Sequence, residues 1–456
     1  VPQTAQGIAR YISAGSIRGI GPKTAETLLQ HFGEQLPAAL ESPTILQSSG
    51  ITEKKARAIS EHWTLRTRYT ELVSLLLSHG IGPATAKRIV DHYGDDTKRV
   101  VTMTPYRLAD DIHGIGFKKA DCIALSQRMP KDAPERVRAG LLHQIQSLQR
   151  EGHCAAPRDI IRQETSKLLL VKDGAIDREI DKLLDEGAFV EDHIGQRPVI
   201  YEARMREREI AVADMVTERT QADCDLTRGV ADLDDLIARA AKSVGIELHE
   251  AQVRAVRIAL SSGIAVITGG PGTGKTSTLK TFIAAYEMIM GEEANVVLAA
   301  PTGRAAKRMT EATGREARTL HRLLGWTASA NRDQSSRREG DRKIDATALV
   351  VDESSMKDLY LTHEVLRALP EGCRLIMVGD ADQLPSVGPG NVLADIVESG
   401  AVPVARLTQI FRQTAGSAIA TAARQINDGR MPTMTDPRHS SDMWQVAVKE
   451  PSGRVA

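Results

Sequence analysis

The sequence predicts an α/β domain with a parallel sheet and a phosphate-binding loop (P-loop), preceded by an all-α array of helix-hairpin-helix repeats and a small winged-helix-like connector. Three observations predict this fold. Glycine-isoleucine pairs recur at a regular interval near the start of the chain, short apolar runs alternate with helical stretches after about residue 206, and a glycine-rich loop follows one of those runs. Continuous apolar strands that alternate with helices indicate a parallel sheet with helices on both faces.

The composition excludes several classes of protein. The 59 basic and 59 acidic residues balance, so a preference for nucleic acid must come from a local surface rather than from net charge. No apolar run approaches the roughly 18 residues of a membrane span, and the N-terminus lacks the pattern of a signal peptide. The four cysteines lie far apart without metal-binding spacing, which fits a reducing compartment. We therefore expect a cytoplasmic protein that does not contact a membrane.

The repeated element near the N-terminus is predicted to be two helices joined by a glycine turn. Its first glycines lie 31, 30 and 34 residues apart, a period that marks a structural repeat. The four copies are Gly19-Ile20-Gly21, Gly50-Ile51-Thr52, Gly80-Ile81-Gly82 and Gly114-Ile115-Gly116. The second copy has Thr52 in place of a glycine, so we expect the other three to bind DNA phosphates through backbone N–H groups, without reading sequence. Protein binding or pure scaffolding is the alternative.

We expect four regions along the chain. The connector is predicted from helical patterns that close in a hairpin with its turn at 195–198. Strands of the α/β domain are predicted at four apolar runs: Ile264–Ile267, Val296–Ala299, Ala348–Val351 and Leu375–Val378. In order, the regions are the repeat array at 1–129, the connector at 130–205, the α/β domain at 206–400 and the incomplete start of a second α/β domain at 401–456.

The glycine-rich loop Gly269–Thr276 fits the pattern G-x-x-x-x-G-K-[ST] between a predicted strand and a predicted helix. Its glycines let backbone N–H groups surround phosphates, and the following helix adds its positive N-terminal end. Lys275 would reach the β- and γ-phosphates of ATP, and the Thr276 hydroxyl would ligate Mg²⁺. Nucleotide contacts are therefore expected from Gly270, Pro271, Gly272, Thr273, Gly274, Lys275, Thr276 and Ser277.

An acidic pair, Asp352 and Glu353, follows the predicted strand Ala348–Val351. Asp352 can hold Mg²⁺, directly or through water, and Glu353 can activate the water that attacks the γ-phosphate. Gln383, after the strand Leu375–Val378, can sense the γ-phosphate and pass its loss to a neighbouring loop. These two motifs complete a predicted site for nucleotide hydrolysis.

A second group of polar residues lies after two other strand ends and suits a DNA backbone. Residues 301–325 contain six basic residues against two glutamates, a local positive surface that the whole-chain charge conceals. The basic residues are Arg304, Lys307, Arg308, Arg315, Arg318 and Arg322. The DNA contacts expected here come from Pro301, Thr302, Gly303, Arg304, Thr319 and His321.

This series of motifs resembles the RecD-like branch of the superfamily-one DNA helicases. The P-loop, Pro301–Arg304, Val351–Glu353 and Gly379–Gly390 occur in that family's order, and the upstream repeats resemble those of its stand-alone members. The resemblance implies a RecA-like motor domain at 206–400 and ATP-dependent 5′→3′ movement on single-stranded DNA. It also implies binding at duplex junctions, a monomer, and a role in DNA repair or recombination.

The same resemblance assigns further roles. Gln252, 17 residues before Gly269, would grip adenine through its amide. Arg412 matches the arginine finger that a second motor domain aims at the γ-phosphate, and a short insert near 327–345 is either a strand-splitting pin or a plain surface loop. Only 44 residues follow Arg412, so we expect a fragment lacking both ends, which binds ATP but neither hydrolyses it efficiently nor unwinds DNA.

Two other functions compete with the helicase interpretation. A conjugative relaxase-helicase has a similar motor, but it requires a His-x-His metal site, and none of the twelve histidines forms that pair. A DNA-binding scaffold whose P-loop domain only switches conformation with nucleotide is the non-enzyme alternative. DNA-stimulated ATPase activity distinguishes a motor from such a scaffold.

Overall fold

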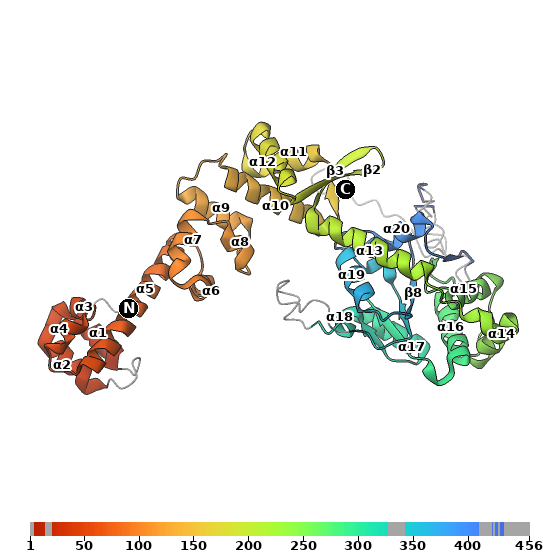
Figure 1. Cartoon of the computed structure of the whole chain (residues 1–456), viewed down its shortest axis with the longest axis horizontal. Coiled ribbons are helices and arrows are strands. Elements are labelled where there is room, and N and C mark those ends of the chain that lie inside the picture. Colours follow the sequence, from red (N-terminus) through yellow and green to blue (C-terminus); the bar gives the residue numbers. More distant parts are fainter. Residues whose placement is uncertain are drawn as a thin grey trace, which may run out of the picture. The chain divides into compact units, whose positions relative to one another are not determined.

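The computed structural model describes residues 4–13, 21–326 and 343–409, with short pieces at 422, 425–426 and 429–432. The chain divides into two compact units. In Figure 1 the colours follow the sequence, from red at the N-terminus to blue at the C-terminus. The first comprises Val1–His143 and Thr165–Glu179, and the second comprises Gln144–Glu164 and Ile180–Ala456. No helix among the described residues has the length and apolar character needed to cross a bilayer.

The first unit is helical, and its turns confirm the predicted repeat. Gly50, Gly80 and Gly114 close three of the turns with φ of +84°, +74° and +90°, a left-handed conformation that glycine adopts without steric cost. Pro22 and Pro83 begin the following helices, where the missing N–H leaves no bond unmade. The helices are α1 Ala5–Tyr11, α2 Pro22–Phe32, α3 Leu36–Ala39, α4 Pro43–Gln47, α5 Glu53–Ser78, α6 Pro83–Tyr93, α7 Thr97–Met103, α8 Arg107–Asp111 and α9 Phe117–Ser126.

The repeats share two apolar cores, which the long helix α5 connects. Ile59 and Trp63 in the first half of α5 pack in one core with residues of α1 to α3. Leu72 and Leu76 near its end pack in the other core with residues of α6 to α9. The last repeat is fixed to α10 (Pro134–Arg150) by Asp121, which accepts hydrogen bonds from Tyr106 (2.6 Å) and Arg136 (2.8 Å).

The predicted connector has the element order of a winged helix. After α10 come β1 (Ala155–Ala156), α11 (Arg158–Leu169), α12 (Asp173–Asp185), β2 (Phe189–Ile194) and β3 (Arg197–Glu202). The three strands form an antiparallel sheet in the order β1-β3-β2. The predicted hairpin is confirmed, but its turn is only Gly195-Gln196, because pairing between Ile194 and Arg197 continues both strands further than we predicted.

A six-stranded parallel sheet organises the second unit and confirms the predicted α/β class. All four predicted strands are present, within one or two residues of their predicted ends. The strands are β4 Ile264–Gly269, β5 Val296–Ala300, β6 Ala317–Thr319, β7 Ala348–Val351, β8 Arg374–Gly379 and β9 Val404–Leu407, in the order β6-β5-β7-β8-β4-β9.

Two short strands at the edges of this sheet were not predicted. Pairing of β6 with β5 extends one edge, and pairing of β9 with β4 forms the other. We assigned residues 401–456 to a second domain, but β9 corrects that boundary, since Val404–Leu407 hydrogen-bond to the P-loop strand. Neither strand is long enough to be recognised from its apolar pattern alone.

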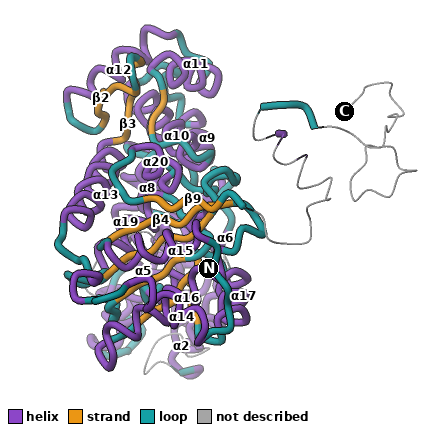
Figure 2. The backbone as a smooth tube through the Cα atoms, turned by 90° about the vertical axis from the view of Figure 1, so that its right-hand side faces the viewer, coloured by secondary structure: helices purple, strands orange, loops and turns teal. Residues whose placement is uncertain are grey.

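Helices cover both faces of the sheet, visible as purple segments around the orange strands in Figure 2. Alternate residues of β4 point to opposite faces, with Val266 in one apolar core and Ile267 in the other. The first core contains residues of α13 (Ala203–Gln221), α19 (Leu359–Ala368) and α20 (Val392–Ser399). The second contains residues of α14 (Leu233–Ser243), α15 (Glu250–Ser261), α16 (Lys275–Met290) and α17 (Gly303–Thr313).

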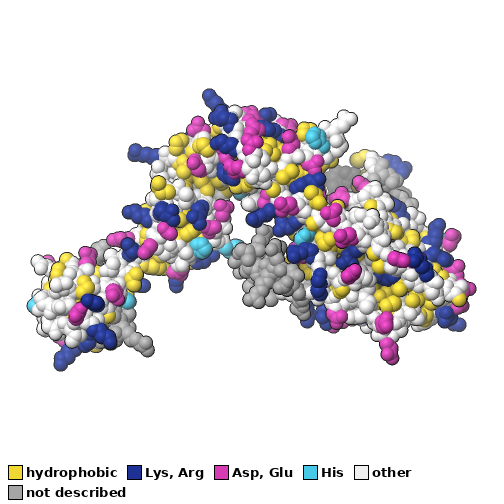
Figure 3. All heavy atoms as spheres, in the orientation of Figure 1, with side chains coloured by type: hydrophobic (Ala, Val, Ile, Leu, Met, Phe, Trp, Pro, Cys, Tyr) yellow, Lys and Arg dark blue, Asp and Glu magenta, His cyan; other side chains and the backbone are white. Residues whose placement is uncertain are grey.

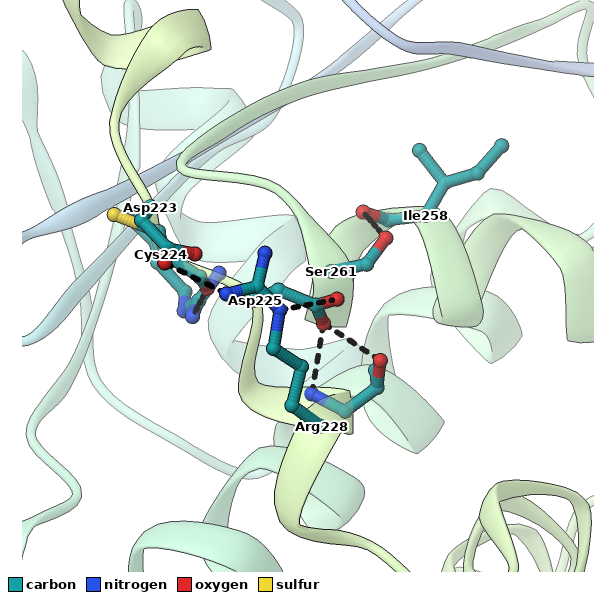
Figure 4. Close-up of polar contacts among 8 residues, drawn as sticks. Asp223, Cys224, Asp225, Arg228, Ile258 and Ser261 are labelled. Atoms are coloured by element: carbon teal, nitrogen blue, oxygen red, sulfur yellow. Dashed lines mark hydrogen bonds and ion pairs between the residues drawn. The ribbon is translucent and has the colours of Figure 1, made fainter.

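The segment between α13 and α14 is fixed by charged groups at the amino end of the sheet. Figure 4 shows Arg228 between two carboxylates, 2.6 Å from Asp223 and 3.7 Å from Asp225. The buried Arg374, at the start of β8, donates to the carbonyl of Ser262 (2.6 Å) and to that of Cys224. These bonds hold the start of the α/β fold against the end of the sheet opposite the P-loop.

Candidate nucleotide-binding site

An open cavity of about 760 Å³ lies at the carboxyl end of the sheet. The whole P-loop from Gly270 to Ser277 borders it, as do the acidic pair Asp352 and Glu353 and one face of α17. Residues more than seventy positions apart in the sequence thus come together, because β4 and β7 are parallel strands of one sheet that end at the same edge.

Two glycines of the P-loop are required by its geometry. Gly274 has a φ of +84° immediately before α16, so the loop turns and the helix begins within one residue. A Cβ on Gly269 would overlap the Leu407 carbonyl and the Thr273 hydroxyl, so only glycine lets β9 pair this closely with β4. The N-terminus of α16 therefore opens onto the cavity, with unpaired N–H groups that favour a phosphate.

Lys275 lies within the loop rather than reaching away from it. Its ammonium donates hydrogen bonds to the carbonyl of Gly269 and to that of Gly270, the latter at 3.1 Å. Thr273 closes the same turn by donating to the Gly270 carbonyl at 2.8 Å. The lysine is thus held where bound phosphates can replace carbonyl oxygens as its partners.

The acidic pair is partly buried, and the two carboxyl groups influence each other. Burial raises the pKa of Asp352, although the N–H of Glu353 (2.9 Å) and the charge of Lys275 oppose the shift. Burial and the Asp352 carboxylate raise the pKa of Glu353, against the charges of Lys275 and Arg308. Glu353 also has a φ of +51°, a conformation that costs a non-glycine residue free energy and is concentrated at functional sites.

These donors fit a magnesium ion bound together with nucleotide. Thr276 offers a hydroxyl and Asp352 a carboxylate oxygen on the same cavity, which are hard oxygen ligands. No cluster of three or more His, Cys, Asp or Glu residues with metal-binding geometry occurs among the described residues. The hydroxyl of Thr276 and the carboxylate of Asp352 are ligands of the kind that Mg²⁺ takes in nucleotide sites, where one or two protein oxygens are joined by phosphate and water.

Gln383 lies near this edge of the sheet but outside the cavity wall. Its turn is tied to the end of β4, since the Ala381 N–H donates to the Thr268 hydroxyl at 3.1 Å. The side chain is exposed, and its amide donates to the buried Asp380 at 3.4 Å. The structure therefore brings Gln383 to the correct edge without bringing it into contact with the P-loop, and its sensing role stays a prediction.

The segment that follows Gln383 is packed against two other parts of the second unit. The Leu359 N–H donates to the Pro389 carbonyl (2.8 Å), and the Gly390 N–H donates to the Gly152 carbonyl (3.0 Å) in the turn after α10. A Cβ on Gly388 would overlap the Asp358 carboxylate, which leaves room only for glycine. This contact with the connector had no signal in the sequence.

Gln252 is buried, and its amide already has intramolecular partners. Its carbonyl oxygen accepts from the His249 N–H (2.9 Å), and its amide donates to the Gly274 carbonyl at 3.3 Å. These bonds connect the first turn of α15 to the P-loop. Contact with adenine, which would use the remaining hydrogen-bonding capacity of the amide, stays a prediction.

The residues predicted to bind DNA near the nucleotide cavity follow the ends of two neighbouring strands. Ala300 of β5 pairs with Thr319 of β6, so Pro301–Arg304 and Thr319–His321 emerge side by side. Both threonine hydroxyls cap helices: Thr302 accepts from the Ala305 N–H, and Thr319 accepts from the Arg322 N–H of α18 (Leu320–Leu323), each at 3.2 Å. The placement fits the prediction, although the capping bonds leave these hydroxyls less available for DNA.

The predicted positive surface is weaker than the sequence indicates. Lys307 pairs with Glu311 (3.9 Å), Arg315 with Glu287 (2.5 Å) and Arg318 with Glu316 (2.9 Å). Arg308 borders the nucleotide cavity. On the face shown in Figure 3, basic and acidic side chains are likewise intermingled over both units.

The glycines of the repeats leave open surface at the predicted phosphate contacts. Gly21, Gly82 and Gly116 each precede a helix, and a Cβ added to any of them would meet no atom within 4 Å. Gly80 and Gly114 form the turns before them. Gly19, Arg412 and most of the insert near 327–345 lie outside the described residues.

A P-loop and an acidic pair at one edge of a parallel sheet define a nucleotide-binding protein of the P-loop class. Comparison with known families agrees along the chain. Residues 247–446 match the model of an AAA domain, residues 65–155 that of the ATP-dependent RecD2 DNA helicase HHH domain, and residues 14–64 that of a SAM-like helix-hairpin-helix tandem.

Individual proteins are also similar. The ATP-dependent RecD2 DNA helicase of Deinococcus radiodurans is 30% identical over 95% of this chain and 60% of its own length. The RecBCD enzyme subunit RecD of Mycobacterium tuberculosis is 42% identical over 39% of this chain and 34% of its own. The Pif1 helicase of Candida albicans, 24% identical, aligns over 42% of this chain and 50% of its own, with a TM-score of 0.28, too low to support an argument.

The chain belongs to the RecD-like helicase family, of the kind with N-terminal helix-hairpin-helix repeats. The chain spans less than two thirds of the length of the RecD2 helicase of Deinococcus radiodurans and of the RecD subunit of Mycobacterium tuberculosis.

Proposed function

We propose that the chain is the ATP-binding part of a DNA helicase that moves 5′→3′ along single-stranded DNA. The observation that carries the proposal is the meeting of the P-loop with Asp352 and Glu353 in one cavity. Phosphates would lie on the loop and on the N-terminus of α16, with Lys275 leaving the Gly270 carbonyl to pair with them. The repeats would add DNA affinity, and the protein would act as a monomer in the cytoplasm on single strands and duplex junctions.

The chemistry follows from the placement of the acidic pair. Asp352 and Thr276 would hold Mg²⁺, which neutralises charge on the phosphates. Glu353, as a carboxylate, would accept a proton from the attacking water, the role for which its position beside the P-loop is suited. Gln383 would report the loss of the γ-phosphate, and Arg412 would supply positive charge from a second domain.

The direct test of the proposal measures ATP turnover and strand separation by the whole protein. We expect turnover to rise on addition of single-stranded DNA, and a duplex with a 5′ single-stranded tail to be separated faster than one with a 3′ tail. Unwinding only from the 3′ tail would contradict the direction. Nucleotide binding without DNA-stimulated turnover would favour a nucleotide-switched scaffold.

A prediction concerns the repeats. Changing Gly82 and Gly116 to Val should lower DNA affinity equally for unrelated sequences, because the side chains block backbone N–H groups from phosphate. A Cβ added at either position meets no atom within 4 Å, so the fold should persist. A backbone N–H carries no net charge, so the slope of log affinity against log salt concentration should become less steep by less than the roughly one per phosphate expected for a lysine contact.

Fluorescence anisotropy with two labelled oligonucleotides of different sequence, over a series of salt concentrations, measures both effects. Gly174→Val, at another open glycine position near the start of α12, is the matched control. If the double variant binds both oligonucleotides as the unchanged protein does, the array is a scaffold.

A further inference from the structure

One wall of the nucleotide cavity is a face of α17 that none of the predicted site residues occupies. Its residues recur at helical spacing: Ala305, Arg308, Met309, Ala312 and Thr313. Ala305 and Met309 are buried and anchor this face, whereas Arg308 is exposed and is the only charged residue on it. The helix α17 therefore presents a single cation to the cavity.

Arg308 differs from three of its basic neighbours in having no acidic partner. Among the described residues, Lys307, Arg315 and Arg318 all form ion pairs, and Arg308 forms none. Arg308 and Glu353 both border the nucleotide cavity. An exposed guanidinium without an ion pair thus shares this cavity with Glu353.

We propose that Arg308 contacts the terminal phosphate of bound nucleoside triphosphate from within the same domain, and thereby distinguishes a triphosphate from a diphosphate. The proposal rests on the nucleotide-binding function proposed above. The P-loop would surround the inner phosphates and Lys275 would reach the β- and γ-phosphates, whereas Glu353 would lie beyond the terminal phosphate to activate water for attack on it. In the same cavity as Glu353, the Arg308 guanidinium would therefore contact the negative charge of the γ-phosphate, which a triphosphate has and a diphosphate lacks.

The chemistry of arginine suits this role. A guanidinium presents several N–H donors in one plane, which matches the oxygen atoms of a phosphate better than an ammonium does. Hydrogen bonds to charged groups contribute roughly 1.5–3 kcal/mol, so one such contact changes affinity by about 10- to 100-fold. An ADP molecule lacks the group that Arg308 would contact, so its affinity should not depend on this side chain.

The experiment compares the binding of ATPγS and ADP to the chain by calorimetry, with Mg²⁺ and without DNA. Arg308→Ala should weaken ATPγS binding by about tenfold or more and change ADP binding by less than twofold. Arg308→Lys should restore part of the ATPγS affinity. Arg239→Ala removes an exposed arginine of α14 that pairs with Asp235 outside the cavity, and it should bind both nucleotides normally.

The outcomes separate this inference from the function on which it rests. Equal weakening of both nucleotides by Arg308→Ala would show a general effect on the cavity wall and overturn the proposal, as would no weakening of either. In both cases Lys275→Ala would still lose nucleotide binding if the proposed site is correct. Failure of the unchanged chain to bind any nucleotide would overturn the proposed function together with the inference.

Discussion

Replacement of Glu353 by Gln should leave ATP binding intact and lower DNA-stimulated turnover by roughly 10²- to 10⁴-fold, the usual contribution of a general base. Glutamine has the same shape and can keep the left-handed backbone at this position, which has a φ of +51°. It cannot accept the proton of the attacking water. Replacement of Lys275 by Ala should instead remove tight ATP binding, because the cation on the P-loop is lost.

Phosphate release by the whole protein with saturating single-stranded DNA measures turnover, and calorimetry measures binding. Glu292→Gln, an exposed residue after α16 that does not border the cavity, is the matched control and should turn over ATP normally. The assignment of Glu353 as general base fails if Glu353→Gln hydrolyses ATP at the normal rate. It is also weakened if the variant loses binding, since the carboxylate would then serve mainly to hold nucleotide and Mg²⁺.

The parts of the fold that the sequence predicts are those with strong local patterns. The strands β4, β5, β7 and β8 are buried apolar runs, and the repeat turns need glycines with positive φ, so both are visible in single segments. The strand β9 has only four residues and is recognisable as part of this sheet only through its pairing with β4. Pairing between distant segments leaves no periodic signal in either one.

The same distinction applies to the candidate site. Lys275, Thr276, Asp352 and Glu353 were predicted to converge because each follows a strand of one parallel sheet, and they border one cavity. Arg308 was predicted to face DNA, because a count of basic residues does not tell which side of a helix each occupies. Its spacing from Ala305 and Met309 on α17 was the available signal, since residues three and four apart share a helix face.

A buried lysine follows the acidic pair Asp352 and Glu353, and no motif indicates it. Lys357 is 1% exposed, and its ammonium has no hydrogen-bond partner within the part of the chain that the structure describes. Burial alone lowers the pKa of its side chain from 10.5 to about 8. Each pKa unit corresponds to ~1.4 kcal/mol, so the charged form of Lys357 costs the folded state roughly 3 kcal/mol near neutral pH.

Replacement of Lys357 by Met should therefore stabilise the protein by up to roughly 3 kcal/mol at pH 7, because it keeps an apolar chain of similar length and removes an unpaired buried charge. Below pH 8 the lysine is protonated in both the folded and unfolded states, so the full cost is present. Between about pH 8 and 10.5 the unfolded state binds more protons than the folded state, so the stability of the unchanged protein rises with pH. The advantage of the variant should therefore shrink across that range.

Urea unfolding of both proteins at several pH values from 7 to 10, compared as a difference, removes the contribution of other titrating groups. A stability difference that stays constant with pH would show that Lys357 does not titrate in this range. A variant less stable than the unchanged protein would show that the Lys357 ammonium has a hydrogen-bond partner. Lys343→Met is the matched control, because Lys343 is exposed and donates to the Arg367 carbonyl at 3.0 Å. An exposed ammonium keeps its water, so this second substitution should change stability by less than about 0.5 kcal/mol, with no dependence on pH.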